Sequence, residues 1–226
     1  MASNNAQLAN LQDKKHFPGF EDLTWDNQLD QDYYRQRDNG FWEPRKHWVF
    51  IGEIVEVEIL LRVKLTVKDR DGLEIPIFIY TEGRGAEIGP SNLQVGHTVV
   101  IFYAVKHLFM DMIIGIRHED LEYLKIFPVS LDDMMKLSDK IQVQATLTDG
   151  MRACHGCNDK SAKLMKCAKC DFFGYCGHNC QLYGWKEKGH KEDCKILRDG
   201  NFKGLFSIKW DEFHNHLSFP LRSVEE

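Results

Sequence analysis

The sequence predicts an α+β protein in which a small antiparallel β-barrel is followed by a compact cysteine-rich module with helices. Residues 45–128 contain five or six short runs of β-branched and aromatic residues, with turn signals between them and no helical pattern among the first three. All seven cysteines lie between Cys154 and Cys194. A chain of 226 residues is long enough for two modest domains. We therefore expect two modules joined by a short linker.

The barrel region starts with HWVFIGEIVEVEILL and continues into RVKLTVKD, in which Val63, Leu65 and Val67 alternate with polar residues. A third strand, LEIPIFIY, contains Pro76, which has no N–H to offer a strand ladder. We expect this strand, or this part of it, to lie at an edge or a bulge. GHTVVIFYAVKH and MIIGIRHEDLEYLKIFP supply the later strands. Short strands with tight turns favour a closed or nearly closed barrel.

The order of these strands resembles the OB fold over about 45–128: three strands, a connection, a strand introduced by Val95-Gly96, and a final strand. Any other small β-barrel or half-open sheet remains an alternative. Residues 1–44 form an acidic lead-in that is too aromatic for a solvated tail, so it should pack on the barrel. Residues 129–151 are a helical linker, with Ser130 as N-cap and Asp133 in a capping-box position.

The cysteine-rich module spans residues 152–200, and residues 201–226 are a tail that we expect to pack on the body of the protein. Within this tail, WDEFHNHLSF predicts an amphipathic helix with Phe213 and Leu217 facing inward. No apolar run approaches the ~20 residues that a membrane span needs, and the start MASNNAQLANLQDKK lacks the features of a signal peptide. We expect an intracellular protein, in the nucleus or cytoplasm.

The cysteine spacing is Cys154-x2-Cys157-x9-Cys167-x2-Cys170-x5-Cys176-x3-Cys180-x9-His190-x3-Cys194. Disulfides rarely persist inside the cell, and seven thiols cannot close a disulfide framework. A redox centre would need one C-x-x-C beside a βαβ pattern, and an iron–sulfur cluster would leave His190 without a role. With His190 the candidate ligands number eight, which is what two tetrahedral zinc sites require. The sequence predicts two Zn²⁺ ions.

A family resemblance follows from the same residues. The eight-ligand spacing, the Tyr175-Cys176 step, Cys180-Gln181 followed by Trp185, and the closing His190-Lys191-x2-Cys194 resemble the MYND zinc finger over about 154–194. One departure is that four residues separate Trp185 from His190, where the family commonly has two or three. The resemblance implies two cross-braced sites, whereas the spacing alone would also allow two consecutive ones. The implied ligands are Cys154, Cys157, Cys176 and Cys180 for zinc 1, and Cys167, Cys170, His190 and Cys194 for zinc 2.

With four protein ligands on each ion, no position stays open for the water that catalytic zinc requires, so we expect both ions to be structural. MYND fingers are known to recognise proline-rich peptides in an extended form. By resemblance, Gln181 and Trp185 would line that peptide groove. The alternatives are a core aromatic at Trp185 and a solvated helix position at Gln181.

Charge argues against nucleic acid as the default ligand of this module. Residues 152–200 carry ten basic and six acidic side chains, yet seven thiolates and two zinc ions would reduce the net charge from +4 to about +1. The whole chain has a formal charge of −5. A nucleic-acid-associated regulator that binds single strands through the OB-like barrel remains the alternative.

The sequence also argues against an enzyme. MYND fingers occur in SET-type lysine methyltransferases, but Asn215-His216 lies beyond the finger without the neighbours that such a domain requires. GRGAEIG lacks the lysine of a phosphate-binding loop, and every cysteine is already assigned to metal. We therefore expect no catalytic residue, and we interpret the chain as an adaptor that engages a protein partner and has no membrane association.

Overall fold

The computed structural model describes residues 8–221, and its chain divides into two compact units. The barrel unit comprises residues 11–134 and 209–220. The cysteine-rich unit comprises residues 135–208 together with the described residues 8–10 and 221. Within residues 8–221, no helix has both the length and the apolar character needed to cross a membrane.

The barrel unit is built on one seven-stranded sheet with the order β7-β8-β5-β4-β3-β6-β9. Its strands are β3 (Val49–Ile59), β4 (Val63–Asp69), β5 (Glu74–Ile79), β6 (Thr98–Phe102), β7 (His107–Leu108), β8 (Ile114–His118) and β9 (Leu124–Phe127). A 3-10 helix, η2 (Ala86–Ile88), lies in the connection between β5 and β6.

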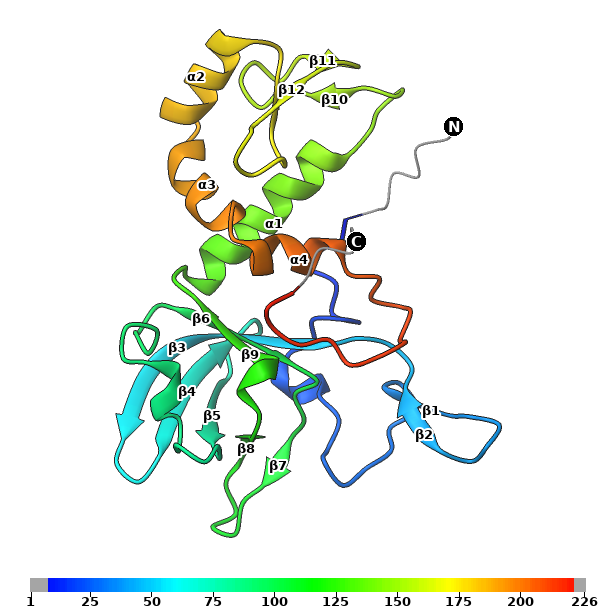
Figure 1. Ribbon diagram of the computed structural model, residues 1–226, viewed down its shortest axis with the longest axis vertical. Helices are drawn as coiled ribbons and strands as arrows, with labels where there is room; N and C mark the ends of the chain where they lie inside the picture. Colours follow the sequence, from blue (N-terminus) through cyan, green and yellow to red (C-terminus); the bar gives the residue numbers. More distant parts are fainter. Residues whose placement is uncertain (1–7, 222–226) are drawn as a thin grey trace. The chain divides into compact units, whose positions relative to one another are not determined.

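The sheet curls into a barrel because β8 and β9 are consecutive parts of one stretch of chain (Figure 1). β8 pairs in parallel with β5, with Ile77 opposite Ile116, and β9 pairs antiparallel with β6, with Val99 opposite Ile126. A five-residue connection, 119–123, which includes the 3-10 helix η3 (Leu121–Tyr123), separates them. A ring of strands therefore runs through β3, β4, β5, β8–β9 and β6, which confirms the predicted OB-like barrel.

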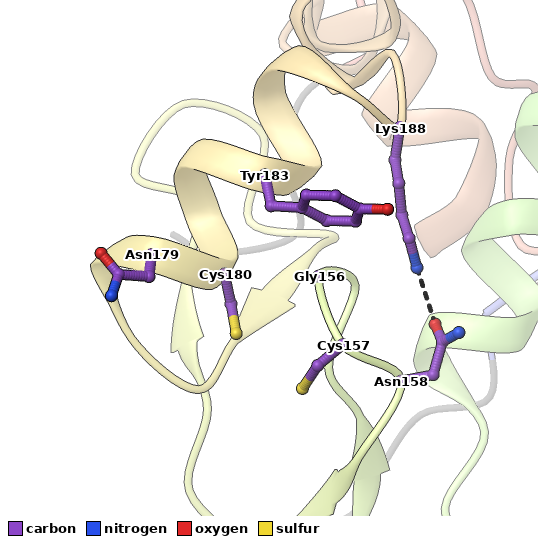
Figure 2. A pocket seen from close by; sticks show the side chains of 7 residues that line it. All are labelled: Gly156, Cys157, Asn158, Asn179, Cys180, Tyr183 and Lys188. Atoms are coloured by element: carbon purple, nitrogen blue, oxygen red, sulfur yellow. Dashed lines mark hydrogen bonds between the residues drawn. The ribbon is translucent and has the colours of Figure 1, made fainter.

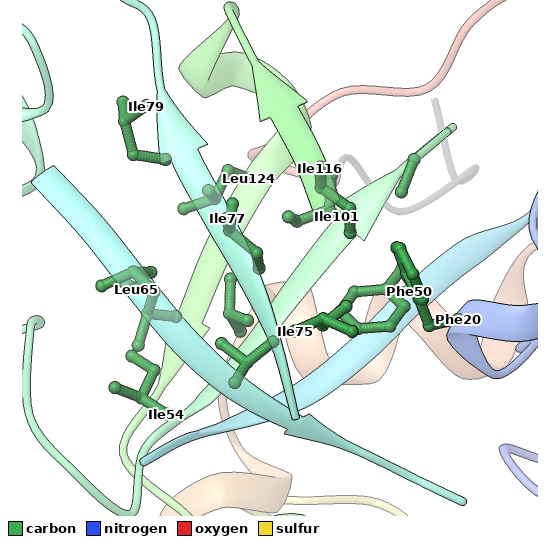
Figure 3. Close-up of a cluster of buried hydrophobic side chains, with 14 of the residues drawn as sticks. Phe20, Phe50, Ile54, Leu65, Ile75, Ile77, Ile79, Ile101, Ile116 and Leu124 are labelled. Atoms are coloured by element: carbon green, nitrogen blue, oxygen red, sulfur yellow. The ribbon is translucent and has the colours of Figure 1, made fainter. Parts of the chain in front are cut away.

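Alternation along the strands places one set of side chains inside this barrel (Figure 3). On β4, for example, Val63, Leu65 and Val67 are buried, while the residues between them are more exposed. Pro76 pairs with Thr66 of β4, but the pairing of β5 with β8 begins only at the next residue. The proline therefore lies where β5 has one hydrogen-bonded neighbour, as its missing N–H predicts.

The aromatic lead-in packs on the barrel, although only in part. Phe20, in the 3-10 helix η1 (Phe20–Asp22), and Tyr33 both belong to the barrel core. The backbone N–H of Phe20 donates to the Asp69 carboxylate at 2.8 Å, which ties η1 to the end of β4. The hairpin of β1 (Tyr34–Gln36) and β2 (Trp42–Pro44) instead leaves Phe41 73% exposed.

The tail contains no helix in the described residues 209–220, so the predicted amphipathic helix around Phe213 is wrong. Its backbone bonds to the barrel instead: the carbonyl of Trp210 accepts from the His47 N–H at 2.8 Å, and the N–H of Leu217 donates to the Tyr103 hydroxyl at 3.0 Å. Because these partners satisfy the backbone, intrahelical hydrogen bonds offer the segment no advantage. Phe213 is still buried, as its apolar character predicts.

The linker forms helix α1 (Leu131–Ala145). Ser130 caps the helix as predicted, since the N–H of Asp133 donates to the Ser130 hydroxyl at 3.1 Å, and that hydroxyl donates to the Asp133 carboxylate at 2.9 Å. The cysteine-rich unit adds two small hairpins and three short helices. They are β10 (Arg152–Ala153) with β11 (Lys160–Ser161), β12 (Met165–Lys166) with β13 (Gly174–Tyr175), α2 (His178–Lys186), α3 (His190–Leu197) and α4 (Gly200–Ser207).

Candidate metal centres

Four cysteines from two separate stretches of chain meet at what we call the first site. Cys154 and Cys157 flank the turn after β10, Cys176 follows β13, and Cys180 lies in the first turn of α2. The Cys157 and Cys176 sulfurs are 3.8 Å apart, and the N–H of Cys176 donates to the Cys154 sulfur at 3.3 Å. A Cβ added to Gly156 would lie 2.6 Å from the Cβ of Cys180. Glycine therefore lets this turn approach α2 closely enough for the four sulfurs to converge.

The second site gathers Cys167 and Cys170, from the turn between β12 and β13, with His190 and Cys194 on α3. His190 and Cys194 are four residues apart, so both side chains project from one face of the helix. The sulfurs of Cys167 and Cys194 are 3.9 Å apart, and Nε2 of His190 lies 3.7 Å from the Cys170 sulfur. The ligand atoms of each site all lie within 4.8 Å of one another.

These spacings suit zinc. Four sulfurs at the usual Zn–S distance of about 2.3 Å occupy tetrahedral corners that are about 3.8 Å apart. The sulfur pairs of 3.8 Å and 3.9 Å match that edge length. Three or four thiolates with one imidazole or none are also the donor sets of structural zinc. The first and third ligand pairs form one site and the second and fourth pairs form the other, so the sites interleave along the chain. The ligand spacing alone had left this pairing open.

The polar environment of the thiols differs from one cysteine to another. For Cys154, burial disfavours the thiolate, but hydrogen bonds from backbone amides, including those of Cys157 and Cys176, outweigh it and lower its pKa to about 6. For Cys194, burial and the neighbouring thiols raise the pKa to about 12. Burial also lowers the pKa of His190 to about 4, so its imidazole is neutral and free to ligate at neutral pH.

The two sites differ most in their exposure. Every ligand of the second site is buried: Cys167 is 4% exposed, Cys170 1%, Cys194 2% and His190 not at all. Aromatic rings surround it, with the Phe173 ring centroid 4.7 Å from that of His190. In the first site Cys154 is buried, but Cys157 and Cys176 are exposed and Cys180 is partly exposed. A zinc ion in the second site would be enclosed, whereas one in the first would lie near the surface.

Residues 154–194 match the family model of the MYND finger. The chain carries a MYND finger. The match covers the whole interval from the first ligand to the last, and it implies zinc at these two sites. No curated protein gives a match to the full sequence.

Among the solved structures to which the chain is similar, three serve as examples, and all three have low sequence identity. One is the OB domain of a Methanosarcina mazei protein, with 11% identity and a TM-score of 0.30 over 43% of this chain and 86% of that one. The second is Schizosaccharomyces pombe Pot1pC bound to single-stranded DNA, with 11% identity and a TM-score of 0.30 over 45% and 94%. The third is the S. pombe Stn1–Ten1 complex, with 15% identity and a TM-score of 0.27 over 50% and 88%.

Helix α2 of the MYND finger presents two different flanks. Gln181 and Trp185 are four residues apart and therefore share one flank, where both are half-buried. Tyr183 lies about half a turn away on the opposite flank, where it is 52% exposed. Between the flanks, Gly184 faces inward, and a Cβ there would lie 2.6 Å from the Tyr175 ring.

An open groove of about 460 Å³ runs along the Tyr183 flank (Figure 2). The ammonium of Lys188 crosses it and donates to the Asn158 side chain at 2.9 Å. The two residues predicted to bind peptide are absent from its lining, which consists of Gly156, Cys157, Asn158, Asn179, Cys180, Tyr183 and Lys188. This groove could not be predicted from the sequence, because it forms only when the turn at Gly156 meets α2.

The barrel carries an aromatic and cationic face formed just before β4, at the end of β5, and on β8 and the loop before it. The guanidinium of Arg62 lies 3.6 Å from the centroid of the Tyr80 ring, and that of Arg117 lies 4.5 Å from it. The Phe109 ring, between β7 and β8, is 4.5 Å from Phe78 and stacks at 6.4 Å on Tyr80. Outward alternation on β5 could have identified Phe78 and Tyr80.

Proposed function

We propose that this protein is an intracellular, non-catalytic adaptor whose MYND finger binds a partner protein through the α2 flank that carries Gln181 and Trp185. The proposed ligand is a proline-rich segment in extended form. The observation that carries the proposal is that Trp185 is only half-buried while its ring is fixed edge-on against His190, with centroids 5.6 Å apart. An indole held in place but still accessible is suited to contact a ligand at little entropic cost.

The chemistry of the flank fits such a peptide. A proline-rich segment already populates the polyproline II conformation, so little chain entropy is lost on binding. Its pyrrolidine rings pack on aromatic faces, which Trp185 supplies. Its backbone carbonyls lack partners within the peptide, and the amide of Gln181, one helical turn away, can donate to one of them. The saturated ligand sets support a structural role for zinc and hence a binding function rather than catalysis.

Titration of the full-length zinc-loaded protein with a fluorescein-labelled proline-rich peptide tests the proposal. Trp185→Ala should abolish the rise in anisotropy, and Gln181→Ala should reduce it. Tyr183→Ala is the matched control, because Tyr183 lies on the opposite flank of the same helix and should not matter. A peptide with alanine in place of each proline should not bind. Equal affinity of the Trp185 and Tyr183 variants would refute this assignment of the binding flank.

The barrel face favours a second candidate function, the binding of single-stranded nucleic acid. Exposed or half-buried aromatic rings stack bases, and guanidinium groups beside them neutralise phosphates. Tyr80, with Arg62 and Arg117 against its ring, provides both elements on the strand face that OB folds use for ligands. Binding of a fluorescent oligonucleotide should weaken steeply with salt and be lost in Tyr80→Ala, while Lys125→Gln on β9 should retain it. An affinity for the oligonucleotide that changes neither with salt concentration nor in either variant would exclude this function.

A further inference from the structure

We propose that Cys157 and Cys176 form an oxidation-sensitive thiol pair. A peroxide would join their sulfurs in a disulfide and release the zinc ion of the first site, while the second site stays intact. The MYND finger would then have one zinc position that responds to oxidants and one that does not.

Distance alone does not single out this pair. The sulfurs of Cys157 and Cys176 are 3.8 Å apart, and those of Cys167 and Cys194 in the second site are 3.9 Å apart. Either pair needs a shift of less than 2 Å to reach a disulfide bond of about 2.0 Å. If proximity decided the outcome, both sites would oxidise at similar rates.

Accessibility is what separates the two pairs. Cys157 and Cys176 are both exposed, whereas Cys167 and Cys194 are 4% and 2% exposed. The open groove of about 460 Å³ is lined by Cys157 and by Cys180 of the same site, so a small oxidant can reach these sulfurs (Figure 2). In the second site, the rings of Phe173 and Trp185 lie against His190. Oxidation of cysteine follows thiolate character and exposure, and zinc holds its cysteine ligands as thiolates.

The reaction balances with hydrogen peroxide as the oxidant. One thiolate attacks a peroxide oxygen, the O–O bond breaks, and a sulfenic acid and hydroxide form. The second thiolate attacks the sulfenic sulfur, the S–S bond forms, and a second hydroxide leaves. The two sulfurs lose two electrons and the peroxide gains them, and two protons from solvent convert both hydroxides to water. With two of its four ligands consumed, the first site no longer holds its zinc.

Release of zinc from the first site would also affect peptide binding, a consequence that rests on the proposed function. Cys176 and Cys180 stand just before and within the first turn of α2, so the first site fixes that end of the helix to the turn at Gly156. Gln181 and Trp185 follow directly on the same helix. Oxidation would loosen the helix that carries the proposed peptide flank, and a thiol reductant with added zinc would restore it.

The test uses the full-length protein loaded with two zinc ions. Hydrogen peroxide is added stepwise, released zinc is measured with a chromogenic chelator, and disulfides are mapped by mass spectrometry after alkylation. We expect loss of one of the two zinc ions in a first phase, together with a Cys157–Cys176 disulfide. Simultaneous loss of both ions, or a Cys167–Cys194 disulfide in the first phase, would overturn the proposal.

A variant separates oxidation from simple metal loss. Cys157→His keeps four donor atoms in the first site, in the three-cysteine, one-histidine combination that the second site already uses, but it cannot form the disulfide. We expect it to lose the first phase of zinc release, and release at the wild-type rate would contradict the proposal. If the variant fails to load zinc, the disulfide map of the oxidised wild-type protein still shows whether Cys157 and Cys176 pair first. None of these measurements needs a peptide ligand, so failure of the proposed function would show separately.

Discussion

The indole of Trp185 meets the imidazole of His190 edge to face, with ring centroids 5.6 Å apart. Trp185 lies on α2, on the flank proposed for peptide binding, and His190 opens α3 as a ligand of the second site. The four intervening residues include Gly189, which caps the start of α3 in a left-handed conformation with a φ of 74°. The four-residue spacing between Trp185 and His190, longer than the family commonly has, therefore still places the indole against the imidazole. One side chain thus links the proposed binding flank to the buried site.

Trp185→Ala should weaken zinc binding at the second site. An edge-to-face aromatic pair contributes about 1 kcal/mol beyond the area that it buries, which corresponds to roughly a fivefold loss of zinc affinity. Trp185→Phe should recover most of that loss, because it restores an aromatic edge. Competition with a chelator of known affinity measures the change. Gln181→Ala shares the flank without a ring on His190 and serves as the control, and an equal loss in that variant would show that the ring contact is irrelevant.

Removal of zinc should unfold the MYND finger and leave the barrel folded. Structural zinc contributes about 10 to 16 kcal/mol of apparent binding energy per site, which in small modules is also folding energy. The barrel unit has its own apolar core, to which β3, β4 and β5 contribute. Hydrogen exchange followed by mass spectrometry, with and without a strong chelator, should show lost protection in residues 154–194 and retained protection in β3–β6. Loss of protection in both units would show that the barrel depends on the finger.

The sequence could predict the barrel because alternation along a strand is a local signal. Val63, Leu65 and Val67 alternate with polar residues in RVKLTVKD, and all three are buried on β4. The N-cap at Ser130 was equally predictable, since Ser130 and its partner Asp133 are only three residues apart. The end of the chain was not predictable in this way. Its segment around Phe213 has a helical apolar pattern, but its backbone partners His47 and Tyr103 lie more than 100 residues away.

The same contrast between local and long-range signals holds for the candidate site. Ligand spacing selected the eight side chains that the structure gathers into two clusters, because two residues between cysteines suit a metal-binding turn and three suit a helix face. Spacing could not show which pairs meet, since that depends on Gly156 letting one turn approach Cys180. It also could not show that Cys157 is exposed while Cys167 is buried. This difference in exposure arises because the fold places aromatic residues around the second site, where they bury its ligands.

Gly184→Ala should destabilise the finger even though alanine favours helices. A Cβ at this position would lie 2.6 Å from Cε1 of Tyr175 and 3.1 Å from Cδ2 of His155, and both rings are buried. Overpacking of this kind costs about 1 to 3 kcal/mol, whereas the gain in helix propensity is about 1 kcal/mol.

Gly200→Ala is the matched control for this substitution. Gly200 lies in the first turn of α4, where a Cβ would meet nothing within 4 Å. Chemical denaturation of the zinc-loaded protein should show a lower midpoint for Gly184→Ala and an unchanged or higher one for Gly200→Ala. A stabilised Gly184 variant would mean that the rings of Tyr175 and His155 yield without cost.

Acid should destabilise the barrel unit through His47. Burial lowers the pKa of His47 to about 4, because the ring lies between the barrel and the tail. Its Nδ1 lies 2.6 Å from the Tyr103 hydroxyl, whose pKa burial raises, and its Nε2 lies 3.1 Å from the Glu212 carbonyl. A neutral ring satisfies both partners, since Nδ1 accepts from the hydroxyl and Nε2–H donates to the carbonyl.

The sign of the effect follows from the protons bound. Between the folded pKa of about 4 and the ordinary value of 6.5, the unfolded state binds more protons at His47 than the folded state does. The free energy of unfolding contributed by this residue is therefore complete above pH 6.5 and falls as the pH drops toward 4, by on the order of 2 to 3 kcal/mol.

Urea unfolding between pH 7 and pH 5 should show this fall in the wild type and a smaller one in His47→Gln. His214→Gln alters a side chain that is 80% exposed and should keep the wild-type profile. An NMR titration that places the imidazole pKa of His47 at its ordinary value would contradict the burial argument directly.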